Sequence, residues 1–236
     1  MDGFQFTADG NWGHFKKRET GNNPLTHDFI TKTALIGMIG AVLGFDRKQM
    51  LPLFPQLSED LLYSVRLNNR VTKNSWGFTS RTAFKPMSAG TPKYFEFLKK
   101  PNFNIIIGLK NKRSEVIFDE FKKFIKDGKS IYTPVFGWHN CPANLEFRDE
   151  GFFEAKNGSF QTNSFVSRIE HTLTEISTDF RIGFENIPTY QSDFYNDPDS
   201  YKEIIYPDAN SEINVSGDYF EYSSFTNKNK EQWWMI

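Results

Sequence analysis

Residues 4–44 read FQFTADGNWGHFKKRETGNNPLTHDFITKTALIGMIGAVLG and predict a strand, a basic loop and a helix, in that order. Phe4 and Phe6 alternate with polar residues, which is the period of a strand with one buried face. Glycine and asparagine then dominate a loop that also carries three consecutive cations. Thr31 is the expected N-cap of a helix over residues 32–43.

This helix is apolar on almost every side, so we expect the rest of the domain to cover it. Gly37, Gly40 and Gly44 recur at helical spacing, and a glycine inside a helix costs about 1 kcal/mol relative to alanine. The spacing therefore predicts a stripe that packs closely against a sheet. A bilayer crossing needs about 20 apolar residues, and this helix is shorter.

Three stretches in this region together resemble a known family: GNWGHF at 10–15, ETGNNPLT at 19–26 and KTALIGMIGAVLG at 32–44. These stretches are similar to the N-terminal sequence of the "Cas five" (Cas5) family of the RAMP superfamily, whose members are subunits of type I CRISPR Cascade complexes. The branch it resembles most is type I-B. The resemblance is dense over about forty residues and weaker after them.

Length and composition are those of a globular chain: 236 residues suit one domain with an extension. Cys141 is the single cysteine, so no intramolecular disulfide can form, and we expect it to be a small buried side chain. The first ten residues lack a basic start followed by an apolar run. We therefore expect a cytoplasmic protein that does not associate with membranes.

Charge is unevenly divided along the chain. Residues 1–130 hold 21 Lys and Arg against 12 Asp and Glu, whereas residues 131–236 hold 7 against 17. Such asymmetry indicates that the first half meets a polyanion while the second faces water or a basic partner. The alternative is that both halves are simply solvated.

The order of the predicted elements indicates an α+β fold. Strands near Phe4, at 61–67, at 103–109 and at 143–147 frame helices over 32–43 and 115–126, which gives a ferredoxin-like (βαββαβ) arrangement, also the RRM topology. We place this domain at 1–148 and a small antiparallel β extension at 149–236. In the extension Asn157-Gly158 predicts a hairpin turn, and residues 189–210 predict an exposed acidic loop.

A long polar segment at about 68–91 interrupts the predicted domain. It mixes basic and aromatic residues and has no buried face of its own, a pattern typical of surfaces that follow single-stranded nucleic acid. The resemblance implies that this insertion is the family's β-hairpin thumb, which presses on the guide RNA.

The resemblance implies a non-catalytic protein that binds the 5′ handle of crRNA, beside a Cascade backbone subunit and the large subunit that reads target DNA at the PAM. We expect the loop and helix start to meet handle phosphates, and the thumb to contact the next nucleotides. The candidate RNA-binding residues are His14, Lys16, Lys17, Arg18, Lys32, Arg66, Arg70, Lys73, Trp76, Phe78, Arg81 and Lys85.

Two other functions remain open. A metal-independent endoribonuclease that processes pre-crRNA would need a base and an acid, for which Tyr132, His139 and His14 with Lys16 are candidates. A free RNA-binding module outside any complex is the second. Scattered histidines and one cysteine argue against a zinc site, and no phosphate-binding P-loop motif occurs, so no cofactor is predicted.

Overall fold

A computed structural model describes residues 1–81, 90–175, 179–189, 201–226 and 230–236. Lys85 and residues 190–200, half of the predicted acidic loop, therefore lie outside the described residues. The described helices are α1 (Lys32–Leu43), α2 (Arg47–Asp60), η1 (Lys112–Ser114) and α3 (Glu115–Lys126). The described strands are β1 (Asp2–Asp9), β2 (Trp12–Gly13), β3 (Leu61–Leu67), β4 (Lys73–Ser80), β5 (Thr91–Lys99), β6 (Asn102–Leu109), β7 (Asn144–Thr162), β8 (Val166–Ser167), β9 (Thr172–Leu173), β10 (Ile182–Pro188), β11 (Tyr201–Pro207), β12 (Ile213–Ser224) and β13 (Lys230–Trp233).

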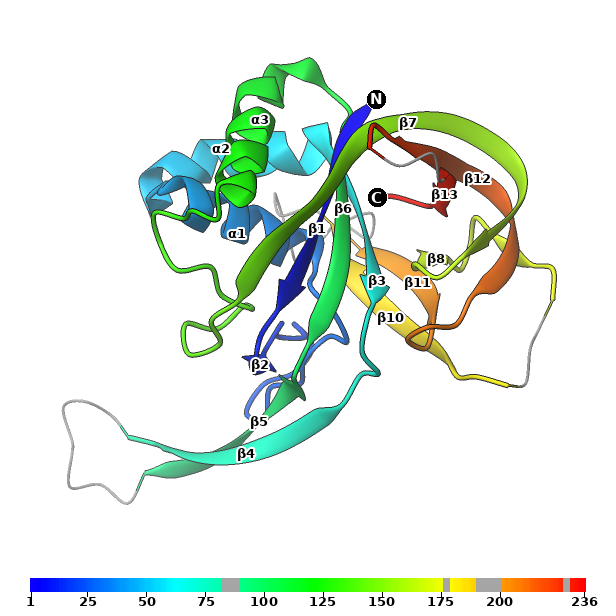
Figure 1. Cartoon of the computed structure of the whole chain (residues 1–236). Helices are drawn as coiled ribbons and strands as arrows, with labels where there is room; N and C mark the ends of the chain where they lie inside the picture. Colours follow the sequence, from blue (N-terminus) through cyan, green and yellow to red (C-terminus); the bar gives the residue numbers. More distant parts are fainter. Residues whose placement is uncertain (82–89, 176–178, 190–200, 227–229) are drawn as a thin grey trace.

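The fold is α+β, as predicted, and its centre is an antiparallel sheet with the strand order β13-β12-β7-β1-β6-β3, to which β9 adds beside β12. The helices lie together on one side of this sheet (Figure 1). Phe4 and Phe6 of β1 point into that layer, with ring centroids 5.2 Å from Phe118 and 5.8 Å from Phe121 of α3. The period-two pattern of β1 thus produces the main helix–sheet core.

The sheet curls until its two ends meet. Strand β7 is continuous across residue 148, the predicted domain boundary, and its second half pairs with β12 in an arched ribbon (Figure 1). Asn157-Gly158 lies inside this ribbon, so the hairpin prediction is wrong: Gly158 sits opposite Gly217, with φ of 143° and 155°. At the far end the backbone of Ile236 pairs with that of Tyr63 in β3.

This closure covers the sheet face opposite the helices. Trp233 and Met235 pack there with Ile106 and Tyr222 in a second apolar cluster. Polar Ser64 on β3 is consequently fully buried, although its alternating pattern predicted a half-exposed strand. The open sheet face on which an RRM binds RNA is therefore filled by the chain's own C-terminal segment.

Helix α2 is longer than its sequence suggested. Pro52 and Pro55 were expected to end a short segment, yet the helix continues through both to Asp60. Asp46 starts it with a capping box that includes Gln49. The helix lies at the surface and its first two turns are largely exposed, so water can bind the carbonyls that the prolines leave unpaired.

The predicted thumb is a hairpin whose bounds differ from the expected 68–91. Strand β4 pairs with β5 over residues 73–99, and β2 extends this second sheet. The hairpin projects from the body of the molecule (Figure 1). The thumb therefore continues past residue 91 to the end of β5 at Lys99.

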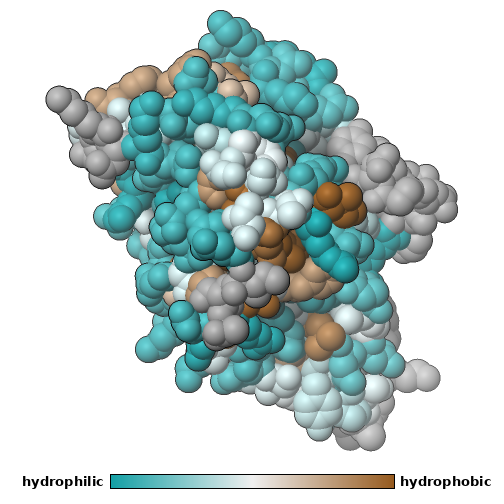
Figure 2. All heavy atoms as spheres, turned by 90° about the vertical axis from the view of Figure 1, so that its right-hand side faces the viewer, coloured by the Kyte–Doolittle hydropathy of each residue, from teal (hydrophilic) through white to brown (hydrophobic). Residues whose placement is uncertain are grey.

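The remaining sheet, β10-β11-β8, comes from the acidic half of the chain. Residues 201–207 form its central strand, so the end of the predicted acidic loop is regular structure. The side of the molecule that Figure 2 shows is hydrophilic over most of its area, with apolar residues in a central band. None of the described helices combines the length and hydrophobicity that crossing a bilayer requires.

Candidate nucleic-acid interface

A pocket of about 920 Å³ opens where the basic loop, the start of α1, the thumb and the β10–β11 sheet meet. Its walls carry cations, histidines and aromatic rings, which is the mixture that single-stranded nucleic acid requires. The lining residues include His14, Lys16, Arg18, His27, Thr31, Thr33, Ala34, Gly37, Ala41, Phe95, Trp138, Pro188 and Tyr201.

Helix α1 forms the floor of this pocket with its smallest residues. Thr31 caps the helix as predicted, since its hydroxyl accepts a hydrogen bond from the Ala34 amide at 3.3 Å. Gly37 was expected to pack against the sheet, but it is exposed and a Cβ placed there meets no atom within 4 Å. The stripe of small residues thus leaves an open hollow at the positive end of a helix.

Aromatic rings of the thumb and of the 135–141 loop form one wall. Trp138 stacks on Phe95 with 5.1 Å between centroids and 12° between planes, and on Phe97 at 5.3 Å. Trp76 and Phe78 of β4 pack against the same rings and remain 44% and 38% exposed. They are therefore rigidly held yet still partly accessible, as stacking on a base requires.

His14 lies at the junction of this wall with the basic loop. Its Nδ1 is 2.7 Å from the carbonyl oxygen of Glu96, and because a carbonyl only accepts, Nδ1 must carry the proton. Burial lowers the pKa of His14, despite the opposing effect of that hydrogen bond. The ring is thus a neutral imidazole of fixed orientation near pH 7.

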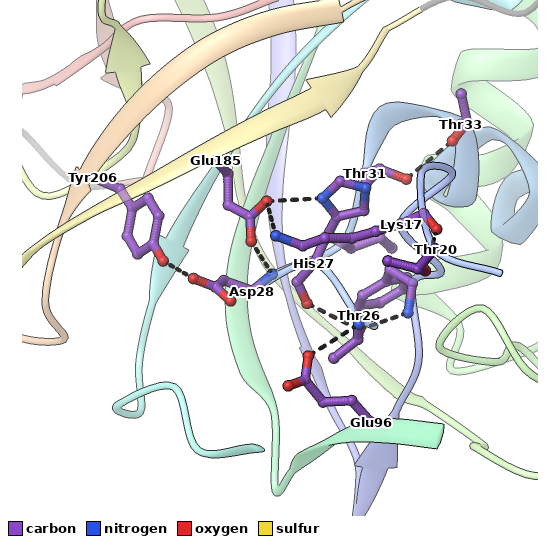
Figure 3. A network of polar contacts seen from close by, with 12 residues as sticks. Lys17, Thr20, Thr26, His27, Asp28, Thr31, Thr33, Glu96, Glu185 and Tyr206 are labelled. Carbon is purple, nitrogen blue, oxygen red and sulfur yellow. Dashed lines mark hydrogen bonds and ion pairs between the residues drawn. The ribbon is translucent and has the colours of Figure 1, made fainter. Parts of the chain in front are cut away.

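A buried polar network holds the loop against the β10–β11 sheet (Figure 3). Glu185 of β10 is 2% exposed, and its Oε2 lies 2.9 Å from both His27 Nδ1 and Lys17 Nζ. Its Oε1 accepts a hydrogen bond from the Asp28 amide at 3.1 Å. Both carboxylate oxygens of Glu185 therefore have partners in the loop, as a buried carboxylate requires.

The network continues into the thumb through Asp28. Its carboxylate accepts a hydrogen bond from the Tyr206 hydroxyl and pairs with Lys73 Nζ at 2.5 Å. Burial acts to raise the pKa of Asp28, but the hydrogen bond and charge of Lys73 outweigh it and lower the pKa overall. Lys73 also lies 3.4 Å from Glu96 and donates to the Thr26 carbonyl. One set of contacts therefore fixes the basic loop, the thumb and the β10–β11 sheet relative to one another.

Comparison with known proteins agrees with the sequence resemblance. A sequence model described as CRISPR-associated protein (Cas_Cas5) matches residues 6–207. The chain belongs to the Cas5 family of CRISPR-associated proteins. No curated protein sequence matches it.

The solved structures to which this Cas5-family chain is similar have low sequence identity to it. A CRISPR protein from Archaeoglobus fulgidus is 14% identical, with a TM-score of 0.63 and 98% of each chain covered. A CRISPR RNA-guided surveillance complex contributes a chain that is 14% identical with a TM-score of 0.47, covering 87% of this chain and 90% of that one. A chain of a type III-B Cmr-beta complex is 11% identical with a TM-score of 0.47, covering 89% of this chain and 86% of that one.

The Cas5-family chain does not use all of its predicted cations in the same way. Lys16 is exposed and lines the pocket with Arg18, as expected for phosphate contacts. Arg81 is exposed at the end of the described part of β4. Lys17 and Lys73, by contrast, are paired with the carboxylates of the buried network, so they contribute to folding rather than to the positive surface.

Three further predicted contacts lie elsewhere. Arg66 is inside the closed sheet, 2.5 Å from Glu231 and with its guanidinium carbon 3.4 Å from the Trp233 ring centroid, and burial lowers its pKa to about 10. Lys32 is 5% exposed and does not line the pocket, and burial, aided by Lys110, lowers its pKa to about 8. Both predictions are therefore wrong as surface contacts. Arg70 is exposed but pairs with Asp208 at 2.8 Å.

Sequence reasoning missed His27, Glu185 and Trp138. His27 lies within the stretch that carries the family resemblance, and Trp138 follows a glycine in a turn-rich loop, so each had a weak local signal. Glu185 had no local signal, because its partners are about 160 residues away.

Among the described residues no three of His, Cys, Asp and Glu are grouped closely enough to bind a metal ion. Cys141 is 1% exposed, as predicted, and burial raises its thiol pKa to about 11.

Proposed function

We propose that this Cas5-family chain is a non-catalytic subunit of a type I CRISPR Cascade complex, most like type I-B. In this proposal it binds the 5′ handle of the crRNA, and its partners are the backbone subunit and the large subunit near the PAM. We further infer that β7-β1-β6-β3, with α1 and α3 on one face, form a ferredoxin-like core. The family membership and the strand order support these inferences.

One observation carries the proposal: cations, stacked aromatic rings and a helix N-terminus line a single pocket. Lys16 and Arg18 are suited to phosphates, and Trp138 and Phe95 to bases. The pocket lies at the base of the thumb, so a strand that enters it also passes Trp76 and Phe78. The closed sheet face gives further support, since the RRM binding surface is occupied by Trp233 and its neighbours.

A second candidate function, metal-independent cleavage of pre-crRNA, has one observation in its favour. His14, Lys16 and His27 line the same pocket, and such groups can serve as base and acid. Of the other residues considered for this role, Tyr132 and His139 are exposed and do not line the pocket. In this second candidate function His14, rather than His139, would act as the base or acid, because it lines the pocket.

Incubation of the purified protein with repeat RNA in EDTA separates these two functions. We expect the RNA to be bound and recovered uncut, read on a sequencing gel. Site-specific cutting that is abolished by His14→Asn would favour the nuclease instead. Copurification with backbone and large-subunit proteins would separate a Cascade subunit from a free RNA-binding module.

The exposed glycine of the pocket floor offers a second test. We expect Gly37→Gln to leave the fold intact, because a Cβ there meets no atom within 4 Å and glutamine favours the helix by up to about 1 kcal/mol over glycine. The side chain would fill the hollow, so affinity for repeat RNA should fall by roughly tenfold or more, equivalent to about one stacked base. Fluorescence anisotropy and thermal melting measure the two effects.

Gly37→Ala is the matched control, because it brings the same gain in helix propensity with far less volume. We expect its melting temperature to rise like that of the glutamine variant, while RNA affinity changes little. Unchanged RNA affinity in a folded Gly37→Gln protein would contradict placement of the nucleotide over α1.

A further inference from the structure

Two nearly buried histidines line the pocket, and each has one ring nitrogen committed to the protein. His14 is 7% exposed and donates from Nδ1 to the Glu96 carbonyl at 2.7 Å. His27 is 2% exposed and its Nδ1 lies 2.9 Å from Glu185 Oε2. No described residue binds the second nitrogen, Nε2, of either ring. In a neutral imidazole whose Nδ1 carries the proton, Nε2 is a hydrogen-bond acceptor.

Neither ring can turn to a different partner at low cost. His14 is packed between Phe97 and Trp138, with centroids 5.4 and 6.1 Å away. His27 is held by Glu185, whose carboxylate also pairs with Lys17. Figure 3 shows the other edge of the His27 ring turned away from Glu185, toward the start of α1. The pocket therefore contains acceptors of fixed direction.

A ligand that fills the pocket displaces water from these nitrogens, and a buried acceptor left without a donor costs binding free energy. A phosphate group has only acceptor oxygens in its ionised form and cannot satisfy them. Nucleotides offer two kinds of donor: the ribose 2′-hydroxyl, which DNA lacks, and the amino or imino groups of bases. Lys16, which is exposed at the pocket, is suited to a phosphate.

We propose that the pocket selects its nucleotide through hydrogen-bond donors that the nucleotide presents to Nε2 of His14 and His27. This inference rests on the proposed function, because it assumes that the pocket binds RNA. It goes beyond that function by assigning two specificity-determining residues and the chemistry that they read. His14 is a candidate RNA-binding residue, and a neutral ring that donates from Nδ1 would accept a hydrogen bond at Nε2, which a base or ribose donor can supply.

The test measures affinity of wild-type protein and histidine variants for synthetic repeat RNA. Two series of RNAs remove single donors: 2′-fluoro substitution deletes one hydroxyl but keeps an RNA-like sugar, and purine riboside or inosine deletes one base amino group. His14→Asn and His27→Asn retain a donor near the position of Nδ1 and remove Nε2. The corresponding glutamine variants place an amide near Nε2 and serve as rescue controls.

In wild-type protein we expect one or two modified positions to weaken binding by roughly 5- to 10-fold, the effect of one lost hydrogen bond. The asparagine variant of the histidine that reads that position should bind native RNA equally weakly and no longer distinguish the modified RNA. Glutamine should restore part of the discrimination. Whichever series shows this coupling identifies the donor as sugar or base.

Wild-type protein that binds RNA but distinguishes no modified position, or folded asparagine variants that discriminate as wild type does, would overturn the inference and leave the proposed function standing. A wild-type protein that binds no repeat RNA would refute the proposed function, and the inference with it. Thermal melting of each variant verifies that a loss of discrimination occurs in folded protein.

Discussion

Glu185→Ala is expected to lower the free energy of unfolding by about 3–5 kcal/mol, the usual cost of removing one partner from a buried ion pair. The carboxylate is 2% exposed and joins Lys17, His27 and the Asp28 amide. Its removal leaves a cation, a ring N–H and a backbone amide with no acceptor at that position. Urea unfolding followed by circular dichroism measures the change.

Glu203→Ala is the matched control for this substitution. Glu203 lies on the neighbouring strand β11, and its partner Arg168 is 3.0 Å away, but both side chains are largely solvated, at 41% and 60%. An exposed pair of this kind contributes about 1 kcal/mol at most. If Glu185→Ala were no more destabilising than Glu203→Ala, the network would not hold the basic loop to the β10–β11 sheet.

The pairing of Lys17 with Glu185 also explains why the charge division of the sequence was only partly informative. Cations of the first half were assigned to a polyanion, but Lys17, Arg66 and Arg70 pair with acids of the second half. Each pair joins residues 138 to 168 positions apart. No local pattern shows which basic residues a fold will neutralise in this way.

The parts of the fold that sequence predicted well are those fixed by short-range chemistry. Thr31 and Gly44 bound α1 at the expected residues, and the nearly continuous apolar run of β6 forms an interior strand between β1 and β3. The prediction that α2 ends at its prolines was wrong, because a proline near the surface lowers the stability of a helix less than a buried one does. The prediction that the glycines of α1 pack against a sheet was wrong, because Gly37 faces a pocket, Gly40 lies against Met50 of α2 and Gly44 lies against Ile131.

Closure of the sheet is the feature least visible in the sequence, because it depends on contacts between the two ends of the chain. Residues 233–236 were expected only as a terminal strand or a docking tail. In the structure they cover polar side chains of β3 and β6, and Arg66 is accommodated there only because Glu231 and Trp233 both bind it. A buried cation of this kind requires its partners.

Trp233→Ala is therefore expected to destabilise the fold as strongly as any single change in the core, by about 3–5 kcal/mol. Trp233 is completely buried, packs with Ile106 and Tyr222, and lies face to face with the Arg66 guanidinium. The substitution leaves a large cavity and also removes a cation–π contact that shields Arg66 from an apolar environment. Urea unfolding gives the loss, and amide exchange of β3 should show the closure opening first.

Phe225→Ala is the control, because this ring is 70% exposed just beyond β12 and its removal should change stability by less than about 0.5 kcal/mol. A double-mutant cycle that adds Arg66→Met separates packing from charge. If Arg66 is stable only through its partners, methionine should recover part of the stability that Trp233→Ala removes, because no buried cation is then left exposed to the cavity. If Trp233→Ala lowered the free energy of unfolding equally in the wild-type and Arg66→Met backgrounds, packing alone would close the sheet.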